Sequence, residues 1–222
     1  MAKQLEIPSR REVIRQWQEG GGSFAAVFPI HYPRELLRAH GLLPVEVWGP
    51  PGVDEAPAAA HLQAYTCPIV RKGLSFLLSG GATGAAGIVV PHGCDSLQGL
   101  GSVLLDFFAG EVPPVHPFYV PRGKRSSDVD FFAQELECLS QRIGETLGRA
   151  PSSADLRGAV EREEEADGLL AELHRRKARL GDLSDLDFYR LVRSREYLPA
   201  ERFFLDLCNK VLGHPEVDVR LQ

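Results

Sequence analysis

Two cysteines carry the clearest chemical signal in this sequence. Cys67 ends the segment QAYTC at residues 63–67, and Cys94 lies in PHGCD at residues 91–95. Each follows an extended or turn-like segment and opens a predicted helix, whose free N–H groups and positive dipole end stabilise a thiolate. Such thiolates are good metal ligands or nucleophiles. Two of them are too few to complete a cluster site.

The same cysteines have a plainer interpretation, because free cysteine is often a small buried hydrophobe. Both, however, lie beside turn residues at the carboxyl side of a predicted sheet, where open α/β folds bind ligands. Their separation is much longer than Cys-x-x-Cys, so it fits neither a zinc knuckle nor a thioredoxin motif. The other two cysteines, Cys138 and Cys208, accompany apolar helical stripes and are expected to pack in a core.

His92 and Asp95 flank Cys94 and are the nearest candidates to assist it. His92 either makes a hydrogen bond within its loop, or donates one to a bound sulfur, or acts on a substrate. Asp95 either favours the dipole of its helix or orients the loop around a ligand. Three further histidines, at positions 31, 61 and 116, also come near predicted strand ends. The glycine-rich run at 80–87 precedes a strand and lacks a lysine, which favours a turn over a phosphate loop.

Bulk composition places the chain among ordinary globular proteins. It has 222 residues and a formal net charge of −5, which argues against sequence-independent binding to nucleic acid. Nothing approaches the roughly 20 apolar residues of a membrane span. The first residues lack the apolar core of a signal peptide, so we expect a cytoplasmic protein. Four cysteines without regular spacing do not indicate a disulfide framework.

The first half of the chain alternates short apolar runs with amphipathic segments. Strands are predicted at 24–28, 42–48, 87–90 and 115–120, and helices at 11–19, 33–40, 68–79 and 95–109, with a loop at 49–60. This alternation predicts right-handed crossovers and an α/β fold: a doubly wound, Rossmann-like parallel sheet of about four strands.

The second half shows helical spacing throughout and no strand candidate. Apolar residues between 132 and 147 recur with a helical period, and further helices are predicted at 154–180, 183–193 and 199–212. We therefore expect a cysteine-bearing α/β domain at 1–125, followed by an all-helical segment at 126–222.

Several of these segments together resemble the 2-hydroxyacyl-CoA dehydratase D-component and benzoyl-CoA reductase family. Residues 33–45 resemble its opening element, and QAYTC and GCD resemble its two N-terminal cysteine motifs. The helical stretch at 156–212 resembles the connector between the family's two α/β domains. The order of these elements is more specific than any one of them.

The resemblance implies a [4Fe–4S] cluster held by three cysteines, two from the first α/β domain and one from a second. Here the first two would be Cys67 and Cys94, with His92 and Asp95 beside them, whereas Cys138 and Cys208 do not match the third motif. The implied chemistry is radical and reductive, acting on an acyl-CoA thioester with electrons from an ATP-hydrolysing activator protein.

Three hypotheses follow. In the first, the chain is a subunit, or an N-terminal half-subunit, of such an iron–sulfur dehydratase or reductase. In the second, it is a cluster-free binding or assembly protein of the same fold, which pairs with a partner subunit or with a second copy of itself. In the third, Cys94 is the nucleophile of a redox or acyl-transfer enzyme.

Overall fold

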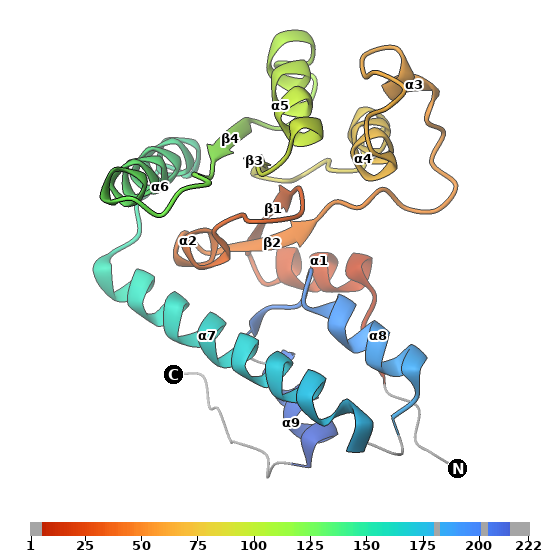
Figure 1. Cartoon of the computed structure of the whole chain (residues 1–222), viewed down its shortest axis with the longest axis vertical. Helices are drawn as coiled ribbons and strands as arrows, with labels where there is room; N and C mark the ends of the chain where they lie inside the picture. Colours follow the sequence, from red (N-terminus) through yellow and green to blue (C-terminus); the bar gives the residue numbers. More distant parts are fainter. Residues whose placement is uncertain (1–5, 180–182, 201–203, 214–222) are drawn as a thin grey trace.

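A four-stranded parallel sheet organises the molecule (Figure 1). The computed structural model describes residues 6–179, 183–200 and 204–213. Its strands lie in the order β2-β1-β3-β4, with every neighbouring pair parallel. Their bounds are β1 (Ser23–Val27), β2 (Leu42–Glu46), β3 (Gly87–His92) and β4 (Val115–Tyr119). The predicted α/β class and the four predicted strands are confirmed.

Helices connect these strands and then form the remainder of the described chain. They are α1 (Arg10–Glu19), α2 (Arg34–Ala39), α3 (Ala56–Ala59), α4 (Pro68–Leu78), α5 (Asp95–Phe107), α6 (Ser126–Leu147), α7 (Ser153–Arg176), α8 (Asp185–Ser194) and α9 (Leu205–Leu212). A 3₁₀ turn at Lys177–Arg179 continues α7, and the end of the predicted helix at residue 180 lies outside the described residues. None of the described helices is both long and apolar enough to cross a bilayer.

The helix α3 corrects one prediction, since residues 49–60 were expected to be a loop throughout. Its first N–H, at Ala56, donates to the Asp54 carboxylate at 3.0 Å. The buried Ala58 N–H donates to Ser75 Oγ of α4 at 3.2 Å. Side-chain acceptors therefore satisfy N–H groups that a short helix leaves unpaired, and a contact with α4 supplies one of them.

The two faces of the sheet are covered by different helices, because side chains alternate along each strand. On one face, Ala26, Ile88 and Val90 pack with buried residues of α4 and α5. On the other, Val27 and Val89 pack with buried residues of α2 and α6. Buried parallel strands flanked by helices on both sides make this a doubly wound sheet.

Close contact between α4 and the sheet depends on a glycine. A Cβ added at Gly73 would lie 2.5 Å from the ring of Phe28, which is fully buried at the end of β1. The missing side chain therefore lets α4 approach the carboxyl end of β1. Since Cys67 directly precedes α4, this contact also sets the position of Cys67.

The helical second half shares a core with the outer strand. Phe24 of β1 and Val45 of β2 belong to the same buried cluster as Leu173 of α7, Leu191 of α8 and Phe204 before α9. Figure 1 shows α7 running beneath α2, with α8 between α1 and the end of α7 and with α9 below α7 in this view. The predicted all-helical nature of this half is confirmed over the described residues, and the boundary at 125/126 stays a prediction.

Candidate functional site at the carboxyl edge of the sheet

The strand order creates a crevice at the carboxyl ends of β1 and β3. The chain leaves β1 for β2 on one side and returns to β3 on the other. Neighbouring connections diverge at such a switch point, and open α/β folds bind ligands there. The loop after β1 carries Ile30 and His31, and the loop after β3 carries Gly93 and Cys94.

Both predicted cysteines begin helices at this edge. Cys67 is the N-cap residue of α4, and Cys94, with extended backbone, is the N-cap residue of α5. Neither side chain makes a capping hydrogen bond, and neither cysteine is in a disulfide. The two thiols are therefore available for other chemistry, at the end of a helix where negative charge is stabilised.

A hydrogen bond joins the starts of the two helices. The backbone N–H of Cys67 donates to the hydroxyl of Ser96, in the first turn of α5, at 3.4 Å. Cys67 is half-buried and packs against the apolar cluster beneath α4 and α5, whereas Cys94 is exposed. The tertiary structure thus brings the two helix starts together across 27 residues of sequence. This positioning role of Ser96 was not predicted from the sequence.

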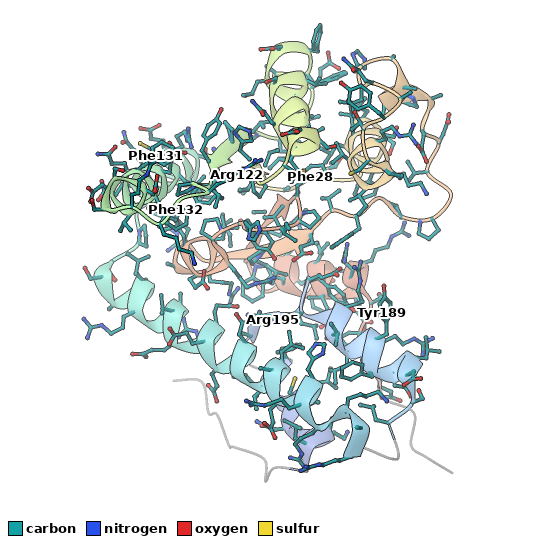
Figure 2. All side chains as sticks on the ribbon, viewed as in Figure 1. Phe28, Arg122, Phe131, Phe132, Tyr189 and Arg195 are labelled. Carbon is teal, nitrogen blue, oxygen red and sulfur yellow. The ribbon has the colours of Figure 1, made fainter. Side chains whose placement is uncertain are left out.

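The structure gives His92 and Asp95 separate surroundings. His92, the last residue of β3, packs edge-on against the ring of Tyr119 at the end of β4, with ring centres 5.0 Å apart. Asp95 is fully exposed and lies 4.0 Å from Arg122. Figure 2 places Arg122 near Phe131 and Phe132 of α6. Both residues lie at the predicted edge, and their proposed assistance to a ligand stays a prediction.

The other three histidines predicted near strand ends have different surroundings. His31 lies against Gly93, where an added Cβ would come 3.5 Å from its imidazole Cδ2, so it is a neighbour of Cys94. His61 is exposed in the turn after α3 and packs edge-on against the ring of Phe108, which directly follows α5. His116 lies inside β4, where burial, with a smaller contribution from Arg142, lowers its pKa to about 4.

The other two cysteines, Cys138 and Cys208, differ in their exposure to solvent. Cys208 is fully buried as predicted, and burial raises the pKa of its thiol to about 12. Cys138 is exposed on α6, so the prediction that it packs in the core is wrong. The buried stripe of α6 runs through Leu139 and Ile143, and position 138 falls beside it. Among the described residues, no three histidine, cysteine or acidic side chains are grouped to hold a metal ion.

Comparison with known proteins matches residues 29–213 to the family described as 2-hydroxyglutaryl-CoA dehydratase, D-component. The chain belongs to this family. It is 28% identical to one of the subunits of benzoyl-CoA reductase of Thauera aromatica over 193 residues, which are 84% of this chain and 49% of that protein. It is 30% identical to the beta subunit of (R)-2-hydroxyglutaryl-CoA dehydratase of Acidaminococcus fermentans over 90 residues, 40% of this chain and 24% of that subunit.

A third relative of this D-component family member is the beta subunit of lactoyl-CoA dehydratase of Anaerotignum propionicum. The two are 25% identical over 145 residues, 64% of this chain and 37% of that subunit. The chain therefore spans about half the length, or less, of the curated relatives it matches. The predicted family is confirmed, and the relatives are subunits of enzymes whose names specify acyl-CoA thioesters.

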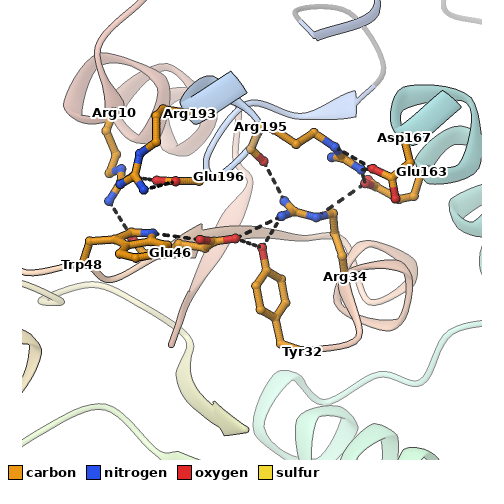
Figure 3. A network of polar contacts seen from close by, with 10 residues as sticks. All are labelled: Arg10, Tyr32, Arg34, Glu46, Trp48, Glu163, Asp167, Arg193, Arg195 and Glu196. Carbon is orange, nitrogen blue, oxygen red and sulfur yellow. Dashed lines mark hydrogen bonds and ion pairs between the residues drawn. The ribbon is translucent and has the colours of Figure 1, made fainter. Parts of the chain in front are cut away.

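A buried polar network ties the helical half of this family member to the outer strand (Figure 3). Glu46, which ends β2, accepts hydrogen bonds from Tyr32 Oη and Trp48 Nε1, both at 2.8 Å, and pairs with Arg34 at 3.3 Å. Its backbone N–H donates to the carbonyl of Glu196 at 3.0 Å. Burial raises the pKa of Tyr32 well above its usual value, so this hydroxyl stays a donor.

A second acid of the network, Glu163 of α7, is almost completely buried. Its carboxylate accepts from Arg195 at 2.5 Å and lies 3.7 Å from Arg38 and 3.8 Å from Arg34. Asp167, one turn further along α7, also pairs with Arg195 at 2.8 Å. The acids of α7 thus pair with the arginines of α2 and with Arg195, which follows α8. Buried charges need such partners, because an unpaired charge is costly to remove from water.

Glu196 completes the network between α1 and α8. It pairs with Arg10 at 2.8 Å and Arg193 at 2.7 Å. Burial and the nearby Glu46 carboxylate raise its pKa to about 7, against the effect of both arginines. This network was not predicted from the sequence. Its one available signal was Glu46, an acid within an apolar strand, since buried acids are almost always paired.

Proposed function

We propose that this chain is part of an iron–sulfur enzyme acting on an acyl-CoA thioester, and that Cys67 and Cys94 ligate a [4Fe–4S] cluster. The observation that carries the proposal is the pairing of two uncommitted cysteines at adjacent helix starts on the switch-point edge. The named substrates of its relatives support the acyl-CoA part.

The residues present suit two positions of such a cluster. Iron–sulfur clusters take cysteine thiolates, and both thiols are outside disulfides and capping bonds. The Ser96 hydroxyl accepts a hydrogen bond from the Cys67 backbone and helps to hold it in place. The remaining ligands would come from other parts of a longer protein, a partner chain, solvent or the substrate. When bound, the cluster supplies a low-potential electron.

The surface around the cysteines suits contact with a larger body. Exposed apolar side chains there include Ile30 after β1, which is 57% exposed, and Tyr65 before α4, which is 84% exposed. Tyr119, at the end of β4, is also exposed. Such a grouping is typical of an interaction surface, and a covering partner would exclude water from the cluster. The proposal includes a partner subunit, an ATP-hydrolysing activator protein and a cytoplasmic location.

Anaerobic measurement of iron tests this function. The protein is produced and reconstituted without oxygen, then iron, sulfide and visible absorption are measured for Cys67→Ser, Cys94→Ser and Cys138→Ser. The first two should lose most of the iron and colour. Cys138→Ser is the matched control, because its thiol is exposed on α6 and should leave the iron content unchanged. Equal iron content in all three variants and the parent would contradict the assignment.

A second candidate is a cluster-free subunit of the same fold that binds a partner. The observation that favours it is the supply of only two cysteines at this edge among the described residues. It predicts no iron after reconstitution, with the thiols of Cys67 and Cys94 both open to alkylation. Sedimentation then distinguishes a self-pairing chain from a monomer that awaits a different partner.

A further inference from the structure

A second hollow lies apart from the cysteine edge, between α1, the end of β2 and the turn that follows α4. Its volume is about 500 Å³, within the range of small-molecule pockets. A shallower hollow of about 470 Å³ continues along α1. Both hollows are lined by Arg11, Ile14, Phe24 and Gly81. They therefore form one groove, called here the α1 groove.

The floor of the α1 groove is mainly apolar and comes from β1, the end of β2 and the turn after α4. Its apolar lining comprises Ile14, Phe24, Ala26, Val45, Val47, Phe76 and Ala82. Small residues give it depth: a side chain at Gly81 would collide with the Phe76 ring, and Ala26 and Ala82 leave room above the strands. Trp48 and Pro50 form a flat wall at the end of β2. An apolar molecule of modest size would gain burial here.

The mouth of the groove carries positive charge from three arginines. Arg10 and Arg193 are committed to Glu196, and Arg193 also lies over the Trp48 ring at 4.3 Å. Arg11 differs, since within the described part of the chain its guanidinium has no hydrogen bond or ion pair. Arg11 can therefore bind an anion without giving up a contact to those residues.

The acidic groups of the groove do not cancel this charge. Both oxygens of Glu46 already accept hydrogen bonds, from Tyr32 and Arg34 on one side and from Trp48 on the other. At the shallow end, Glu19 is paired with Arg15 at 2.9 Å. The groove therefore combines an apolar body with an unbalanced cation at its mouth.

We propose that the α1 groove binds a small amphipathic anion, with an aromatic or aliphatic body on the apolar floor and a carboxylate or phosphate group at Arg11. The charge complementarity with Arg11 and the enclosed volume select this class of occupant. The site is separate from the cysteines and does not depend on the function proposed above, so either can fail while the other stands.

Anilinonaphthalene sulfonate is a suitable probe, because it joins an aromatic body to one negative charge. Its binding to the full chain is titrated by fluorescence, beside the neutral phenylnaphthylamine. Arg11→Gln should weaken the anionic probe about 5- to 10-fold, or about 1–1.4 kcal/mol, and leave the neutral probe unchanged. Arg157→Gln removes the same charge from an exposed position on α7 and should alter neither. Ile14→Trp fills the floor and should weaken both probes.

Emission from Trp48, which lines the groove, tests whether the probe binds within the range of energy transfer. The chain has two tryptophans, so Trp17→Phe leaves Trp48 as the single emitter, and binding should quench it by energy transfer. The proposal would be overturned if Arg11→Gln and Ile14→Trp both bound the sulfonate with unchanged affinity. It would also be overturned if the Trp48 fluorescence did not change when the probe was added. Circular dichroism verifies that each variant is folded. If Ile14→Trp does not fold, Arg11→Gln alone still tests the proposal, because Arg11 is exposed.

Competition distinguishes the two sources of the anionic group. Naphthoate and naphthyl phosphate are added to the probe-bound protein, with naphthalene methanol as the neutral control. Displacement by the two anions at concentrations where the alcohol has no effect supports the site, and the stronger anion identifies the head group. Equal displacement by the alcohol refutes a role for charge.

Discussion

Neutralising Glu163 should destabilise the protein more than any other single removal of surface or network charge. The side chain is 2% exposed and faces Arg195 at 2.5 Å, Arg38 at 3.7 Å and Arg34 at 3.8 Å. At 3.7 Å and an effective dielectric constant of ~20, one such pair is worth about 4–5 kcal/mol before desolvation. Glutamine retains an acceptor for Arg195 but removes the negative charge that the three arginines face. We expect Glu163→Gln to lower the free energy of unfolding by about 3–5 kcal/mol.

Urea unfolding followed by circular dichroism measures this change. Glu164→Gln is the matched control, because the neighbouring position on α7 is exposed and should stay within about 0.5 kcal/mol of the parent. A double-mutant cycle with Arg195→Gln should return a coupling of about 1–3 kcal/mol, since the two side chains are in direct contact. A Glu163→Gln variant as stable as its control would refute the argument that this buried carboxylate holds the arginines.

Substitutions at three other positions should change the stability of the protein in a defined direction. The pKa of Glu196 is raised from 4.5 to about 7, so the folded state binds its proton more tightly than the unfolded state does. Its contribution to the free energy of unfolding is therefore complete below pH 4.5 and is lost as the pH rises to 7. Thermal unfolding of Glu196→Gln should lack this loss of about 1–3 kcal/mol, and an opposite slope would show that its arginines prevail. The pKa of His116, lowered to about 4 from 6.5, acts in the other direction, so the parent should lose about 1–3 kcal/mol relative to His116→Gln as pH falls through that range. Gly73→Ala should cost about 1–3 kcal/mol by collision with Phe28, whereas Gly99→Ala, in open space on α5, should stabilise by about 0.5–1 kcal/mol in the same melt. Equal melting temperatures for the two alanine variants would contradict that account.

Local pattern sufficed for most of the fold. Runs such as residues 87–90 are apolar enough to indicate a strand buried on both faces, and β3 lies there. The helical period between 132 and 147 likewise led to α6. Prediction failed where a partner distant in sequence decided the outcome. The turn α3 depends in part on Ser75, and Cys138 is exposed because α6 presents its neighbouring stripe to the sheet.

Some features of the candidate site could likewise be predicted from local sequence, and others depended on tertiary structure. The types and positions of Cys67 and Cys94, and their place at the starts of two helices, follow from the sequence by itself, because turn residues and apolar periodicity are local properties. That the two starts share a hydrogen bond through Ser96 was decided by the tertiary structure, through the order of the strands and the packing of α4 against Phe28.

Only the tertiary structure revealed the network around Glu46 and Glu163, and the α1 groove with Arg11 at its mouth. The physical reason is that charge pairing and enclosed volume depend on distances between elements that the chain joins through long connections. Glu46 and Glu163 are 117 residues apart, yet Arg34 pairs with both. Sequence pattern thus determined the elements and the reactive residues, and packing decided which of those residues meet.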